Sequence, residues 1–105
     1  RGMKICFDTS HSKLYCNWAN VDFYDQVREI LPYTSHLHLA DASGLDGEGL
    51  QVGEGVIDWV EFFKVAKGYH GTMIPEIWRG HQRGGEGFLI ALNRLSEAYF
   101  KVIEE

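Results

Sequence analysis

Apolar and polar positions along the chain follow three rounds of a short apolar run and then a helical pattern. Residues 3–8 (MKICFD) are an apolar run that ends in turn chemistry, which is typical of a buried strand. Residues 34–40 (TSHLHLA) alternate strictly, with histidines on one face and leucines on the other, and predict a second strand. Residues 72–77 (TMIPEI) predict a third, although Pro75 cannot donate to a ladder.

The segments after these runs carry helical periodicity. In residues 21–31 apolar side chains recur at steps of three and four, which predicts an amphipathic helix that Pro32 closes. Residues 58–68 begin with capping-box spacing and predict a second helix that ends at Gly68. A glycine-rich turn then precedes a long final helix over residues 88–102.

Two stretches lack a clear period. Residues 10–20 are expected to be a polar connection. Residues 41–55 are rich in glycine and poor in apolar side chains, which predicts a long loop that covers a site.

Alternation of strands and helices predicts an α/β fold with a parallel sheet and right-handed connections. Residues 1–105 are expected to form a single domain of three βα units. Such units could make a small three-layer sandwich, or part of a (β/α)8 TIM barrel, which takes roughly 250 residues when complete. The chain opens on its first apolar run with no lead-in, which suggests a piece of something longer.

Composition and charge limit the kinds of molecule that the chain is expected to bind. With 45% hydrophobic and 24% charged residues, the chain can bury a core. The net charge of −5 disfavours nucleic acid and membrane surfaces as partners. Cys6 and Cys16 form no disulfide framework, so both are expected to be free thiols, with Cys6 in the core. No apolar run approaches the roughly 18 residues of a membrane span, and we expect a cytoplasmic protein.

Each predicted strand ends next to a side chain that can bind metal or move protons, namely Asp8, His38 and Glu76. In parallel α/β folds the carboxyl ends of the strands share one side, so these side chains are expected to converge there. The set suits a divalent ion such as Mn, Co, Zn, Fe or Mg. The alternative is that Asp8 begins a turn, His38 is a core histidine and Glu76 is a solvated strand end.

Other polar residues lie close to these positions. His11 could orient a substrate oxygen or bind a second metal, or lie solvated in a loop, and His36 is expected to be a structural residue. Arg79 and His81, before Gly84-Gly85 and a helix start, could hold an anionic group of a substrate, although a plain turn fits equally well. The acids of the predicted loop could transfer protons or be solvated; they are Asp41, Asp46, Glu48 and Glu54.

Four motifs in order carry a family resemblance: DTSH at 8–11, HLHLAD at 36–41, GEGVIDW at 53–59 and PEIW at 75–78. Together they resemble the C-terminal part of the xylose isomerase-like sugar isomerase and epimerase superfamily, which also contains endonuclease IV-type enzymes. The resemblance implies a (β/α)8 barrel of which this chain holds the sixth to eighth βα units. It also implies that Asp8, His38 and Glu76 are three of four metal ligands and that His11 contacts substrate.

Residues 46–55 and 74–88 are similar, more narrowly, to the barrel domain fused to sialic-acid-synthase-like proteins of surface-polysaccharide pathways. The chain also departs from the family. The fourth metal ligand and the acid/base glutamate of the sugar epimerases would both lie before Arg1, and Gly44 stands where those enzymes place an arginine.

Two functions follow as expectations. The first is metal-assisted proton transfer next to a carbonyl of a sugar or sugar-derived acid through an enediolate-like intermediate, with the isolated chain weakly active at best. The second is a non-catalytic accessory or structural unit that self-associates through open sheet edges. The partners expected are a small sugar-type molecule and either a second copy of the chain or the rest of the barrel.

Overall fold

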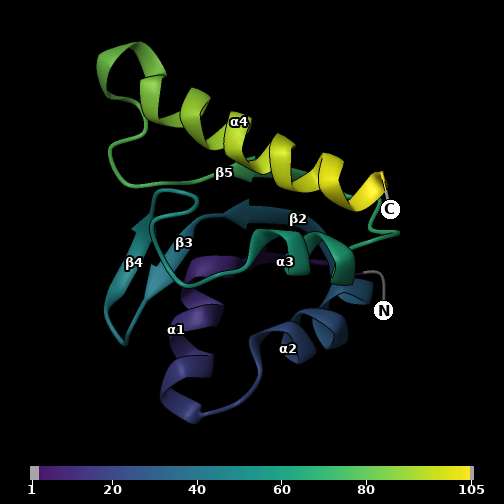
Figure 1. The fold of residues 1–105 in the computed structure, drawn as a ribbon. Helices are drawn as coiled ribbons and strands as arrows, with labels where there is room; N and C mark the ends of the chain where they lie inside the picture. Colours follow the sequence, from purple (N-terminus) through teal and green to yellow (C-terminus); the bar gives the residue numbers. More distant parts are fainter. Residues whose placement is uncertain (1–2, 105) are drawn as a thin grey trace.

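A three-stranded parallel sheet forms the centre of the computed structural model, which describes residues 3–104 (Figure 1). Its strands are β1 (Ile5–Asp8), β2 (Thr34–Leu39) and β5 (Thr72–Pro75). The order is β1-β2-β5, and β2 is parallel to both neighbours. Strands that follow one another as predicted βα units are therefore neighbours in space, and the predicted parallel α/β arrangement is confirmed.

Helices fill the connections between the strands. They are α1 (Thr9–Ala19), α2 (Phe23–Ile30), α3 (Trp59–Val65) and α4 (Gln82–Ile103), with a 3-10 turn, η1 (Leu31–Tyr33), before β2. The three predicted helices correspond to α2, α3 and α4. Near its start α4 is interrupted at residues 83–85, whose backbone φ angles are positive, so its regular part begins after the predicted glycine turn.

Helix α1 corrects the prediction of a polar connection over residues 10–20. The Asp8 carboxylate caps its first turn by accepting from the His11 N–H at 2.9 Å, and Asn20, with a φ of 56°, ends it. The helix leaves Tyr15 and Trp18 largely exposed. Its apolar stripe is therefore weak, and the sequence pattern does not reveal it.

A hairpin replaces the predicted loop over much of residues 41–55. Strands β3 (Asp41–Ser43) and β4 (Gly47–Leu50) pair antiparallel. Gly44, in the turn between them, has a φ of 63°, which a residue without a side chain adopts at low cost. The hairpin lies beside α1 (Figure 1).

The core lies on one face of the sheet. Phe7, Leu37 and Leu39 point from the strands into a cluster with the buried faces of the helices. From α2, α3 and α4 that cluster includes Phe23, Val27, Phe62, Phe63, Ala91 and Leu95. The helices pack against this face of the sheet and bury these apolar side chains.

The opposite face of the sheet carries alternate strand residues and is not covered by any element within residues 3–104. Cys6 on this face is exposed, and His36 and His38 are half-buried. The expectation that Cys6 lies in the core is therefore wrong, because the pleat turns Phe7 rather than Cys6 toward the helices. One covered and one uncovered face fits part of a (β/α)8 barrel and not a three-layer sandwich.

Helix α4 is the longest helix of the structure. Neither α4 nor any other helix in the described part of the chain qualifies as a membrane span by length and hydropathy together.

Candidate active site at the carboxyl ends of the strands

An open cavity of about 590 Å³ lies at the carboxyl ends of β1 and β5. All predicted site residues except His38 line it: Asp8, His11, Glu76, Arg79 and His81. Ser10, Glu48 and Gly49 complete the wall on the side of α1 and the β3–β4 hairpin. The structure thus brings together side chains that are far apart in the sequence.

Asp8 and His11 are held by the start of α1. The Asp8 Oδ1 atom accepts from the His11 backbone N–H at 2.9 Å and lies 3.3 Å from His11 Nδ1. A carboxylate in this capping position is fixed by the first turn of the helix. The same local geometry therefore orients both residues.

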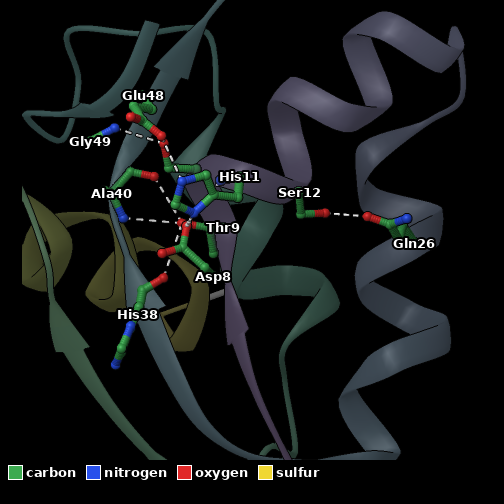
Figure 2. Close-up of polar contacts among 10 residues, drawn as sticks. Asp8, Thr9, His11, Ser12, Gln26, His38, Ala40, Glu48 and Gly49 are labelled. Carbon is green, nitrogen blue, oxygen red and sulfur yellow. Dashed lines mark hydrogen bonds and ion pairs between the residues drawn. The ribbon is translucent and has the colours of Figure 1, made fainter. Parts of the chain in front are cut away.

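Glu48 is a site residue that the sequence did not distinguish from its neighbouring acids. Its Oε2 atom lies 2.6 Å from His11 Nε2 (Figure 2). The hydrogen bond to Glu48 raises the pKa of His11 above its ordinary value of 6.5, and the nearby charge of Asp8 adds to that effect while burial opposes it. The pair couples two groups that can carry protons at the rim of the cavity.

Gly49 hydrogen-bonds the hairpin to α1 on one side of the cavity and to the loop after β5 on the other. Its N–H donates to Ser10 Oγ at 2.8 Å, and its carbonyl accepts from the Trp78 N–H at 2.8 Å. Gly49 has a φ of 64°, and a Cβ there would lie 3.6 Å from the Trp78 nitrogen. These bonds hold Glu48 next to His11, and no feature of the local sequence predicts them.

His38 stands apart from the cavity. Its backbone carbonyl oxygen lies 3.4 Å from the Thr9 hydroxyl oxygen, and Figure 2 shows its ring pointing away from Asp8. The ring instead meets that of His36 edge to face, with centroids 5.0 Å apart. The structure therefore places Asp8 and Glu76 in one cavity and leaves His38 on the adjoining face of the sheet.

Arg79 and His81 lie exposed in the loop between β5 and α4. The Arg79 guanidinium stacks on the Trp78 ring, 4.0 Å from its centroid. Both residues face the cavity, where the sequence predicted a contact to an anionic group. That contact stays a prediction.

Asp41, one of the acids of the hairpin region, has a structural role. It is fully buried, and its Oδ1 atom accepts from the N–H groups of Ala42 and Ile57 at 2.9 Å each. Its Oδ2 atom accepts from the Gly53 N–H at 3.0 Å and from Trp59 Nε1 at 3.1 Å. Asp41 is therefore neither solvated nor open to a substrate, and it shapes the connection from β2 to α3.

Comparison with known proteins identifies the family to which the fold belongs. A family model described as xylose isomerase-like TIM barrel matches residues 1–98. The chain belongs to this family. Over 78 residues, or 72% of its length, this xylose isomerase-like chain is 32% identical to "Uncharacterized protein MJ1311" of Methanocaldococcus jannaschii. The match covers 26% of that relative, so the chain spans about a quarter of its length.

Proposed function

We propose that the chain forms part of a metal-dependent sugar or sugar-acid isomerase or epimerase, which moves a proton next to a carbonyl. The observation that carries the proposal is the gathering of Asp8, His11, Glu48 and Glu76 at one cavity of a xylose isomerase-like fold. These residues come from the end of β1, the first turn of α1, the β3–β4 hairpin and the position directly after β5. Active sites of barrel enzymes lie on this side of the sheet.

The donor set is chemically suited to a divalent ion such as Mn, Co, Zn or Mg. Asp8 and Glu76 supply carboxylates from the cavity, and His38 is paired in register with Asp8 on the neighbouring strand. His38 would have to turn its ring toward Asp8 to complete the set. When bound, such an ion supplies polarisation of a carbonyl oxygen.

His11 and Glu48 are the chain's own candidates for positioning a substrate and moving its proton. His11 lies at the cavity rim within hydrogen-bonding distance of Glu48, so a proton given by His11 to a substrate oxygen can be replaced from Glu48. Arg79 and His81 line the same cavity and supply positive or hydrogen-bonding groups for hydroxyl or acid groups of a sugar.

The motifs at 46–55 and 74–88 support a narrower form of the proposal. They favour a role in carbohydrate or surface-polysaccharide metabolism, as a barrel domain fused to a sialic-acid-synthase-like protein. In this proposal residues 1–105 are one C-terminal portion of a barrel domain.

A second candidate is a non-catalytic unit that associates with itself. Within residues 3–104, β1 and β5 each pair with β2 alone, so the outer edge of each is unpaired. Unpaired strand edges recruit further strands. Light scattering distinguishes this candidate, because a mass equal to one chain would count against it.

Calorimetric titration with Mn²⁺ tests the enzyme proposal. Mn²⁺ prefers carboxylate and imidazole ligands over thiolate, so it reports on the cavity. We expect the chain to bind Mn²⁺, Glu76→Ala to lose most of the affinity, and Glu97→Ala, which removes an exposed acid of α4, to keep it. Equal binding by all three proteins, or none by the unmodified chain, would refute the proposed site.

A further inference from the structure

The uncovered face of the sheet holds a second group of metal-binding side chains, one layer below the proposed cavity site. Cys6 on β1 lies opposite His36 on β2, and His38 follows two residues later on the same face. Their ligand atoms all lie within 4.8 Å of one another. No other group of three or more such side chains in residues 3–104 is this compact.

We propose that Cys6, His36 and His38 form a second site, for a zinc-like transition metal ion, which shares His38 with the proposed cavity site. A thiolate with two imidazoles is a softer ligand set than Asp8, His38 and Glu76, and it favours Zn²⁺ or Co²⁺ over Mg²⁺ and Mn²⁺. The proposal goes beyond the isomerase function and does not require it.

The three ligand atoms lie near enough to one another to reach a shared tetrahedral centre. Zn–S bonds of about 2.3 Å and Zn–N bonds of about 2.0 Å place neighbouring ligand atoms roughly 3.3–3.6 Å apart. Ligand atoms within 4.8 Å of one another would have to approach by up to about 1.5 Å, which rotation of the side chains can supply. Strands fix the Cα positions of all three residues, so the group is organised without metal.

Thr72 on β5 orients one of the ligands. His36 Nδ1 lies 2.7 Å from Thr72 Oγ1, and the Thr72 hydroxyl donates to the Ser35 carbonyl at 3.4 Å. The threonine oxygen is then the acceptor for an Nδ1–H of His36, which leaves Nε2 with its lone pair for a metal. Partners of this kind commonly fix the tautomer of metal-bound histidines.

Within residues 3–104 the three side chains are not fully buried. Cys6 is exposed, and His36 and His38 are half-buried on a face that no element within residues 3–104 covers. Three protein ligands leave the fourth position of a tetrahedral centre for water or another small ligand. Because His38 belongs to both groups, occupancy of this site would compete with the cavity site for its ring.

Cobalt spectroscopy tests the site directly. Titration of the reduced chain with Co²⁺ should give one equivalent of binding with a thiolate-to-cobalt charge-transfer absorption, which added Zn²⁺ abolishes. Cys6→Ser should remove the absorption, and His36→Asn should weaken Co²⁺ binding by about tenfold or more. Circular dichroism checks that each variant is folded.

Two matched controls make the assignment specific. Cys16→Ser alters the other cysteine, which is buried, and should keep the absorption. Glu76→Gln removes a ligand of the cavity site only and should also keep it. Absence of the absorption in the unmodified chain, its persistence in Cys6→Ser, or its loss in Glu76→Gln would overturn the inference.

The outcomes separate this inference from the proposed function. Mn²⁺ binding that depends on Glu76 together with no thiolate absorption would overturn the Cys6 site and leave the isomerase proposal in place. A Cys6-dependent absorption with no Mn²⁺ binding would support the Cys6 site and contradict the cavity site.

Discussion

His11 Nε2 lies 2.6 Å from Glu48 Oε2, which joins the start of α1 to the β3–β4 hairpin across 37 positions of sequence. Two hydrogen bonds of Gly49 hold this contact in place. The Gly49 N–H donates to the Ser10 hydroxyl, and the Gly49 carbonyl accepts from the Trp78 N–H. The hairpin is thereby part of the cavity wall, and the pair places two proton-carrying groups beside Asp8.

Glu48→Gln should lower the pKa of His11 in the metal-free protein. The pKa of His11 is raised mainly by its hydrogen bond to the Glu48 carboxylate, and glutamine removes that charge. Because the folded pKa is raised, the pair's contribution to stability is complete below the ordinary histidine pKa of about 6.5 and is lost as the pH rises through the folded value.

NMR titration of the His11 ring in chelator-treated protein measures this effect. Glu54→Gln is the matched control, because Glu54 pairs with Arg94 instead, at 3.4 Å. An unchanged pKa of His11 in Glu48→Gln would show that the contact does not persist in solution.

Asp41→Asn should lower the free energy of unfolding by about 2–4 kcal/mol. The buried carboxylate accepts four N–H hydrogen bonds, and an amide offers only one oxygen while its NH₂ group faces the remaining donors. Urea unfolding measures the change. Asp46→Asn, at an exposed position of the hairpin turn, serves as control and should unfold at nearly the same urea concentration as the unmodified chain.

Thr9→Val should destabilise the chain by about 2 kcal/mol, whereas Thr9→Ser should retain most of the stability. The buried Thr9 hydroxyl donates to the Ala40 carbonyl at 2.8 Å and accepts from the Ala40 N–H at 3.0 Å. Valine has nearly the same shape but leaves both backbone groups unpaired. Thermal unfolding of the two variants measures the difference. Equal losses of stability in Thr9→Val and Thr9→Ser would mean that the hydroxyl is unimportant.

The sequence predicted the strands and most helices because their patterns are local. Alternation over 34–40 fixes which side chains of β2 face the helices, and the carboxyl-end rule brings Asp8 and Glu76 to one cavity. Helix α1 escaped prediction because its apolar side chains, such as Trp18, stay exposed.

Other features depend on contacts between distant segments. In the sequence, Glu48 cannot be told from the other acids of residues 41–55. Only in the folded chain do the hydrogen bonds of Gly49 place it beside His11. The direction of the His38 ring is a choice of side-chain torsion, which no pattern of residue types encodes.

Mn²⁺ added to the isotope-labelled chain tests most directly, by NMR, the proposal that Asp8, His38 and Glu76 hold one divalent ion. Paramagnetic broadening should be strongest for Asp8, His38 and Glu76, with His11 next, and Glu76→Gln should lose it. Broadening centred instead on the exposed acids of other helices, or unchanged in Glu76→Gln, would contradict the claim.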